Sequence, residues 1–199
     1  ISCKDTPGLS RPQSLNEKIK WLLKHDRNPL MPVCVDKLKV KEYVREKIGM
    51  DICPESIAVA NSVQDLYQKI KVSLFHPQKF FIKANNDSGG TTYIDGNLDE
   101  WVLGNGPSII EAHRHRPYGV EKGEWFYQHV PYKCFSEKSL GNNIIDYKFH
   151  CSLGEPRFCQ VVSGRQTKNG PKEAIVSLEG DVLGFHLCRK MEKTKQFDK

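Results

Sequence analysis

The chain has 199 residues, of which 38% are hydrophobic and 27% charged, and its formal net charge is +6. This composition predicts one domain or two small lobes with a hydrophobic core, and it excludes a disordered chain. The mild positive charge fits an anionic ligand or solubility alone, and nucleic acid is not an expected partner because no dense Lys/Arg block is interleaved with aromatic residues.

The first part of the chain predicts helices separated by turns. Ser14–Glu17 is a capping box at the start of a helix. Asp36 is placed to cap a second helix, which Gly49 ends. A short apolar run at Ile57–Ala60 and a short helix at Gln64–Ile70 follow.

The most informative stretch predicts a β-hairpin beside a lysine. An apolar run ends on Lys83, a polar turn with Gly89 and Gly90 follows, and Thr91–Ile94 predict a second strand. Glycines let a ligand approach the backbone, and free amide N–H groups beside a lysine suit a polyphosphate. The alternative is an ordinary hairpin with a solvated lysine. The order of residues is not that of a Walker A loop.

A helix is predicted around Asn97–Leu103, and residues 104–123 after it are rich in Gly, Pro, His and Arg. This composition predicts a flexible loop. His113 and His115 are two positions apart, but no third ligand is evident nearby. A solvated loop is therefore favoured over a metal site.

The last part of the chain predicts antiparallel strands. Tyr147–Leu153 and Arg157–Val162 predict two strands, with a turn at Gly154–Pro156 between them. Glu173–Leu178 and Val182–Leu187 predict another hairpin. Because helices lead and an antiparallel sheet follows, an α+β fold is expected rather than a doubly wound sheet.

The seven cysteines are odd in number and show no Cys-x-x-Cys spacing, so a zinc ribbon is unsupported. Reduced thiols in a cytoplasmic protein are expected. Four cysteines lie in strand-like apolar runs, where core positions are expected: Cys134, Cys151, Cys159 and Cys188. The sequence shows no signal peptide and no membrane-spanning apolar run. Because the chain begins at Ile1 and ends in a charged stretch, a longer native polypeptide is expected.

Three further positions carry polar chemistry. Asp146 and Lys148 are two apart on a predicted strand, so both side chains share one face and can bind phosphate, metal or sugar groups. A surface ion pair is the alternative. Glu137 follows an apolar run and can begin a segment that binds adenine through backbone groups, or it is a solvated strand end. Arg165 follows another apolar strand.

In this order, the elements resemble the TupA-like branch of the ATP-grasp superfamily, which is found in bacterial surface-polysaccharide gene clusters. The resemblance covers nearly the whole chain. It rests on Leu15–Leu22, Asp26–Leu30, Asp36–Val44, Ile48-Gly49, Ile82–Asn85, Ser88-Gly89, Glu124-Trp125, Ser136-Glu137, Asp146–Phe149 and Gly154–Phe158.

The resemblance implies an α+β, ATP-grasp-like fold in which N-terminal helices precede two β-rich lobes with a nucleotide cleft between them. The implied organisation is a helical region over 1–60, a first lobe over 61–131 and a second lobe over 132–199. The first lobe carries the phosphate-binding hairpin and the loop 104–123. The second carries an antiparallel sheet that is incomplete at the C-terminus.

The resemblance also assigns roles to residues. The implied nucleotide-binding residues are Lys83, Ser88, Gly89, Gly90, Glu137 and Asp146. Lys148 and Arg165 are the implied catalytic residues, which would offset negative charge on the phosphates and on an acyl phosphate. Glu137 would begin the adenine-binding segment.

The chain departs from the family pattern in two places. Asn86-Asp87 stands where the family has His-Gly, which puts a negative charge near the expected phosphates. Nothing after Arg165 matches the acidic Gly-Glu-x-Thr-Phe type segment that holds magnesium, so no metal ligands are assigned. The sequence is therefore expected to be a fragment or a shortened form with weak ATP binding and little turnover.

The implied function is an ATP- and Mg²⁺-dependent carboxylate–amine ligase. It would join an acidic sugar or polysaccharide precursor to an amine acceptor through an acyl phosphate. Peripheral membrane association would come through biosynthetic partners. The alternatives are a non-catalytic nucleotide-binding or scaffold module, a polysaccharide-modifying (glycosyl)transferase, and a phosphotransferase on the same fold.

Overall fold

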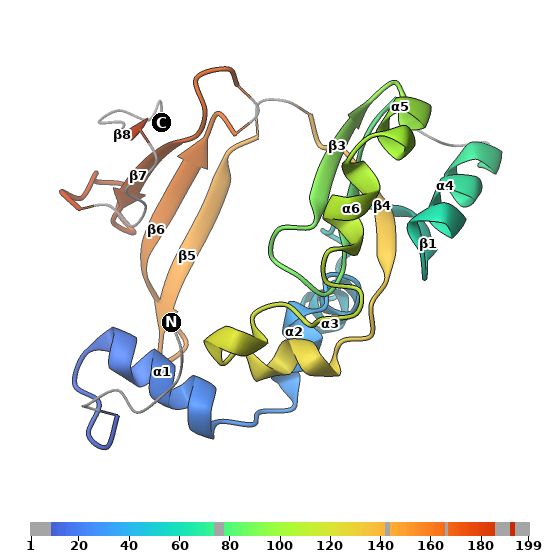
Figure 1. Cartoon of the computed structure of the whole chain (residues 1–199). Helices are drawn as coiled ribbons and strands as arrows, with labels where there is room; N and C mark the ends of the chain where they lie inside the picture. The colour runs from blue at the N-terminus through green and yellow to red at the C-terminus, as the bar shows by residue number, and fades with distance from the viewer. Residues whose placement is uncertain (1–8, 74–77, 142–143, 166, 186–191, 194–199) are drawn as a thin grey trace. The chain divides into compact units, whose positions relative to one another are not determined.

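The computed structural model describes residues 9–73, 78–141, 144–165, 167–185 and 192–193. The chain divides into two compact units, Ile1–Ser139 and Leu140–Lys199. Among the described residues, each unit contains one four-stranded sheet, and the helices belong to the first unit (Figure 1). The predicted mixture of helices and antiparallel sheet is confirmed.

The sheet of the first unit has the strand order β1-β4-β2-β3, and all its neighbouring strands are antiparallel. Its strands are β1 (Ser56–Ala60), β2 (Lys79–Ala84), β3 (Thr91–Asp95) and β4 (Cys134–Lys138). β2 and β3 are the predicted hairpin, with Lys83 paired to Thr91. β4 lies between β1 and β2, and this explains why the first unit extends to Ser139.

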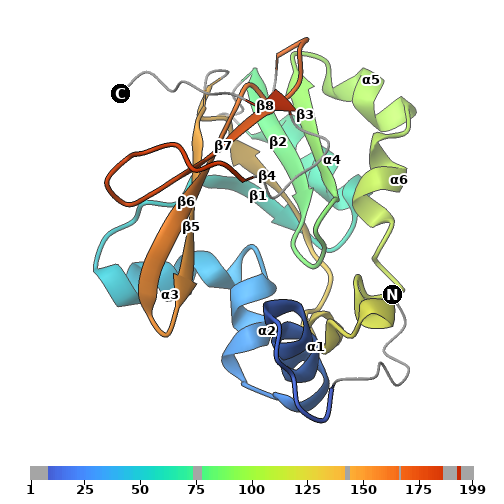
Figure 2. The ribbon, with the colours of Figure 1, turned by 90° about the vertical axis from the view of Figure 1, so that its left-hand side faces the viewer.

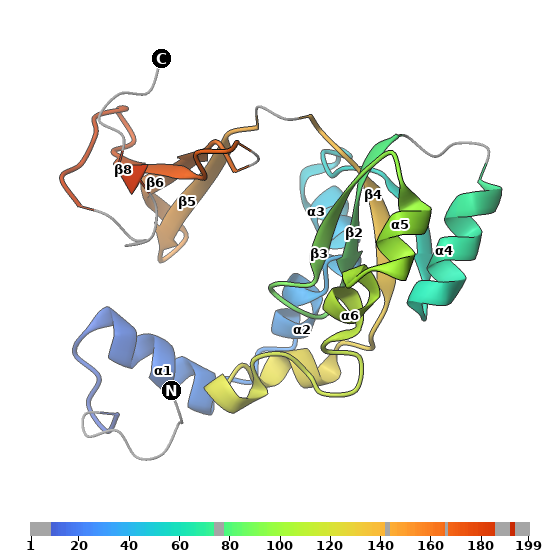
Figure 3. The same ribbon diagram turned by 45° about the horizontal axis from the view of Figure 1, so that its top comes forward.

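One face of this sheet is covered by three helices, which Figures 1 and 3 show on the side away from α2 and α3. The three are α4 (Val63–Val72), α5 (Leu98–Leu103) and α6 (Gly106–Glu111). β2 alternates, so Phe80, Ile82 and Ala84 are buried against these helices while Lys83 points to the other face. Leu66 and Ile110 are fully buried in the same core.

Two N-terminal helices, α1 (Leu15–His25) and α3 (Lys39–Ile48), form as their end signals predict. A further helix, α2 (Leu30–Val35), forms between them where the sequence predicts only turns. The capping box is confirmed, because Ser14 and Glu17 each accept a backbone hydrogen bond from the other. The Asp36 carboxylate accepts from the first N–H groups of α3, and Gly49 ends that helix with a φ of +69°. The helices that the structure describes are too short or too polar to cross a bilayer.

The segment 104–123 differs from the predicted loop. It contains α6 and the short 3-10 helix η1 (Val120–Lys122), and η2 (Trp125–His129) follows. Ile110 on α6 is fully buried in the core. The Gly, Pro and His content of the segment does not favour a helix, but burial of Ile110 in the core stabilises α6.

The second unit has the strand order β5-β6-β7-β8, with its last pair parallel. Its strands are β5 (Asp146–Ser152), β6 (Glu155–Ser163), β7 (Lys172–Val176) and β8 (Glu192–Lys193). β5 and β6 form a long hairpin (Figure 2). Its turn is Leu153-Gly154, both with positive φ, so Glu155 and Pro156 belong to β6 and not to the predicted turn. The other predicted hairpin is represented by β7 and a bridge from Val176 to Val182, and Leu187 lies outside the described residues.

The described cysteines are unpaired thiols. Cys134 and Cys159 are buried as predicted. The prediction of a core position is wrong for Cys151, which is exposed because no residue of the edge strand β5 is buried on either face. Cys188 lies outside the described residues.

Candidate functional site

The register of β2 and β4 brings Lys83 to Glu137, although 54 positions separate them. Lys83 pairs with Phe135, and Phe81 pairs with Glu137. Directly paired residues of an antiparallel sheet share a face, so Lys83 and Glu137 are diagonal neighbours. The Lys83 ammonium donates to Oε1 of Glu137. The family resemblance implies a nucleotide-binding role for both residues, but nothing in the sequence predicts this ion pair.

Lys41 of α3 joins the same carboxylate, and the sequence analysis gave it no role. Its Nζ lies 2.6 Å from Oε2 of Glu137 and donates to the Pro54 carbonyl and to Ser56 Oγ. We call Lys41, Glu137 and Lys83 the buried triad. The exposed fractions of their side chains are 14%, 7% and 23%. No local signal identifies Lys41, because its partners lie on β1 and β4.

The buried triad has two positive charges against one negative charge. Its remaining positive charge attracts an anion. Glu137 also restricts both ammonium groups, because each donates to a different oxygen of one fixed carboxylate. This holds Lys83 at the end of β2, next to the glycine-containing loop. The arrangement can therefore present a positioned lysine to a phosphate.

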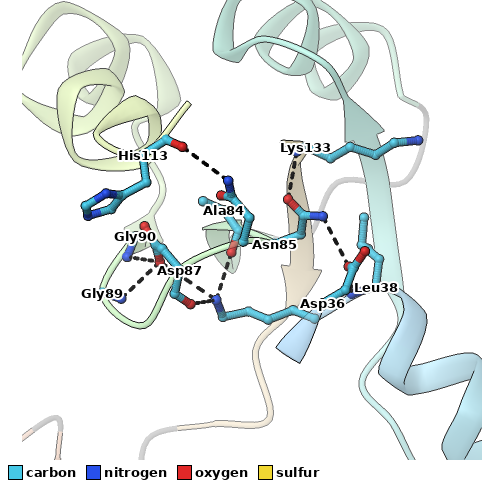
Figure 4. Close-up of polar contacts among 11 residues, drawn as sticks. Asp36, Leu38, Ala84, Asn85, Asp87, Gly89, Gly90, His113 and Lys133 are labelled. Carbon is cyan, nitrogen blue, oxygen red and sulfur yellow. Dashed lines mark hydrogen bonds and ion pairs between the residues drawn. The ribbon is translucent and has the colours of Figure 1, made fainter. Parts of the chain in front are cut away.

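The loop after β2 is closed by one of its own side chains (Figure 4). Oδ1 of Asp87 accepts hydrogen bonds from the N–H of Gly89 at 2.9 Å and of Gly90 at 2.6 Å. The Lys37 ammonium donates to the carbonyls of Asp87 and Ala84. The N–H groups of Gly89 and Gly90 are the amides that the sequence predicts to bind phosphate. Ser88, assigned with them, is exposed.

Asn85 anchors the start of this loop, a role that the sequence analysis missed. Its backbone N–H donates to the Lys133 carbonyl, and its side-chain Oδ1 accepts from the Lys133 N–H, just before β4. Its Nδ2 donates to Asp36 and to the Pro131 carbonyl at 3.1 Å each (Figure 4). The side chain is buried, so these bonds satisfy polar groups that water does not reach. The loop is thereby tied to the start of α3 and to β4.

A second charged group lies in the second unit. Asp146 Oδ2 accepts from Lys148 Nζ at 3.0 Å and from Arg165 Nε. We call these residues the exposed triad, since their side chains are 34%, 45% and 47% exposed in that order. Partial burial raises the pKa of Asp146, but the hydrogen bonds from Lys148 and Arg165 outweigh it and hold the pKa below its usual value. Asp146 and Lys148 meet as their spacing predicts.

The described residues form no evident site for a metal ion. Within the described part of the chain, no three His, Cys, Asp or Glu side chains are grouped where they could hold one. The Nδ1 atom of His113 lies 3.2 Å from the Arg116 carbonyl oxygen, and its ring packs edge-on against Tyr118. Asp146 is already hydrogen-bonded to two cations. The described carboxylates therefore do not by themselves fit a magnesium site.

Comparison with protein families identifies a match. The family described as TupA-like ATPgrasp matches residues 17–185, a range that includes both triads and the glycine-containing loop. Comparisons with curated proteins and with solved structures found no match. The family match covers well over half of the chain and agrees with the resemblance seen in the sequence. The chain therefore belongs to the TupA-like ATP-grasp family.

Proposed function

We propose that the chain is an ATP-dependent carboxylate–amine ligase. Membership of the ATP-grasp family supports a fold like that of ATP-dependent ligases. The observation that carries the proposal is the position of Lys83, the penultimate residue of β2, which lies near the glycine-containing loop and is fixed by Glu137. A positioned lysine next to two backbone amides suits the terminal phosphates of ATP.

The proposed reaction has two steps. A substrate carboxylate attacks the γ-phosphorus of ATP, which forms an acyl phosphate and releases ADP. An amine then attacks the acyl carbon, which forms an amide and releases inorganic phosphate and a proton. Lys83 would hold the terminal phosphate, and Lys148 and Arg165 would offset the charge of the acyl phosphate. The segment that begins at Glu137 would bind adenine.

The substrate class and the setting follow the family resemblance. The acid would be an acidic sugar or polysaccharide precursor of the bacterial surface, and the work would take place in the cytoplasm. Mg²⁺ would accompany ATP. Since magnesium usually keeps several water ligands and is held by one or two carboxylates together with substrate phosphates, it would reach the site bound to ATP and would not need a cluster of carboxylates.

Lys83→Met tests the phosphate contact. We expect ATP binding to weaken by about 1–3 kcal/mol, the scale of a lost charge-assisted hydrogen bond. Lys79→Met is the matched control, because Lys79 lies on the same strand and makes an exposed ion pair with Asp95. Calorimetric titration with Mg·ATP measures both. Equal affinity of the wild type and Lys83→Met would remove Lys83 from the site.

ADP release under single-turnover conditions tests the ligase chemistry. Enzyme in excess over labelled ATP detects even slow turnover with a panel of uronic acids and amines. The ligase predicts ADP release that requires both the acid and the amine. ATP binding without such release would favour the non-catalytic module. That alternative is favoured by one observation: Lys83, Lys148 and Arg165 are all paired with carboxylates of the chain. Consumption of a sugar nucleotide without ATP would indicate a glycosyltransferase.

A further inference from the structure

The loop after β2 forms an anion site whose anion is a carboxylate of the same chain. Two amide N–H groups, from Gly89 and Gly90, donate to Oδ1 of Asp87. The Lys37 ammonium lies 3.8 Å from that oxygen. Figure 4 shows the amides turned toward the Asp87 carboxylate. Converging amides beside a lysine are the donor set with which protein loops bind phosphate.

Burial distinguishes this arrangement from an exposed turn. The Asp87 side chain is almost wholly buried, and its Oδ2 finds no hydrogen-bond partner among the described residues. A Cβ added at Gly90 would collide with that oxygen, so the carboxylate fills the space over the glycine backbone. Burial lowers the pKa of Lys37, and the Asp87 charge acts against this shift. The carboxylate is therefore held by the donors that an anion would use.

We propose that Asp87 occupies the phosphate position of the Gly89–Gly90 loop and that a polyphosphate binds there only after the carboxylate leaves. The inference rests on the proposed function, because it takes the entering anion to be the polyphosphate of ATP. Rotation of the Asp87 side chain would free both amides and release Lys37 from its charge. A phosphate oxygen would then accept the same hydrogen bonds.

In this arrangement the Asp87 carboxylate competes with phosphate for the same donors and thereby sets the affinity of the loop for a polyphosphate. Each hydrogen bond that a phosphate gains from Gly89 or Gly90 replaces one to the Asp87 carboxylate, and its attraction to Lys37 replaces the ion pair at 3.8 Å, so only the difference contributes to binding. The entering phosphate must also displace a buried negative charge, which repels it until the side chain moves. Residue 87 therefore lowers the affinity of the loop for ATP without touching the bound nucleotide.

Asp87→Ala and Asp87→Asn in the full chain test the inference. Titration calorimetry with Mg·ATP and with inorganic tripolyphosphate measures affinity, and amide NMR follows the Gly89 and Gly90 resonances. We expect both variants to bind at least about tenfold more tightly than the wild type, the effect of one charge-assisted hydrogen bond. Asp95→Ala is the matched control, because it removes the same charge from the exposed far end of the hairpin. The affinity of Asp95→Ala for both ligands should stay within about twofold of the wild-type value, as expected for the loss of a screened surface charge.

The outcomes separate the two proposals. If the wild type binds Mg·ATP and neither Asp87 variant binds more tightly, the competitor is disproved while nucleotide binding stands. If neither the wild type nor any variant binds either ligand, nucleotide binding itself fails, and the competitor fails with it. Tighter binding by Asp87→Asn alone supports the inference if Asp87→Ala proves unfolded by tryptophan fluorescence. Tighter binding without ADP release supports the competitor and rejects the ligase.

Discussion

The two triads share one plan but differ in burial. Each has one carboxylate between two cations, Glu137 in the first unit and Asp146 in the second. The Glu137 side chain is about one-fifth as exposed as that of Asp146, from 7% against 34%. Charges that lie away from water interact strongly and depend on one another, whereas solvent screens exposed charges. The same kind of ion pair should therefore contribute much to the free energy of unfolding of the first unit and little to that of the second.

The difference also concerns the response to a ligand. In the buried triad, Lys41 and Lys83 depend on Glu137, so an arriving phosphate would meet a fixed lysine. In the exposed triad, water can replace Asp146 as a partner of Lys148 and Arg165 at little cost. The first triad is therefore suited to hold a group in position. The second is suited to release its cations to a substrate.

The largest effect is expected from Glu137→Gln. The change leaves Lys41 and Lys83 facing each other without a countercharge, so the free energy of unfolding should fall by about 2–3 kcal/mol. Urea unfolding followed by tryptophan fluorescence measures this in the first unit alone, because Trp21, Trp101 and Trp125 all precede residue 140. A loss as small as that of Asp146→Asn would contradict the assigned difference in burial.

A smaller loss is expected from Lys41→Met. Glu137 keeps Lys83 as its partner, but the Pro54 carbonyl and Ser56 Oγ each lose a donor. The free energy of unfolding should fall by about 1–2 kcal/mol, the effect of lost hydrogen bonds in a partly buried place. The same fluorescence measurement applies, with Lys39→Met at the start of α3 as the control. Equal stability of the two variants would show that Lys41 is not held by the triad.

Asp146→Asn should have a still smaller effect on the second unit. We expect the free energy of unfolding to change by less than about 1 kcal/mol, because exposed ion pairs contribute little. The buried thiol of Cys159 on β6 provides the probe, since its alkylation rate in urea, followed by peptide mass measurement, reports opening of that sheet. A larger loss would mean that Asp146 supports the sheet as well as its two cations.

The smallest effect concerns pH. The folded pKa of Asp146 is lowered below its usual value of 3.8. Its stabilising contribution is therefore complete above that pH and is lost as the pH falls through the folded pKa. NMR titration of the Asp146 carboxyl carbon should show the lowered midpoint, and Lys148→Met should raise it. An unchanged midpoint in Lys148→Met would show that Arg165 alone causes the shift.

Local signals in the sequence are sufficient for several elements. The capping box at Ser14, the end of α3 at Gly49 and the β2–β3 hairpin depend on neighbouring residues and form as predicted. The meeting of Asp146 with Lys148 follows from strand alternation alone. The turn at Leu153-Gly154 is displaced from its predicted place because Pro156 can sit in β6 without donating an amide hydrogen bond.

Short-range order along the chain is enough to identify the family, the ends of α1 and α3, and the residues of a strand that share a face. The place of β4 between β1 and β2, and hence the pairing of Glu137 with Lys83 and Lys41, depends on tertiary packing. Tertiary packing also decided that α6 forms where a loop is predicted, through the burial of Ile110. Lys83 and Lys41 lie 54 and 96 positions before Glu137. Contacts between residues this far apart depend on how whole strands and helices pack, so the spacing of residues along the chain does not predict them.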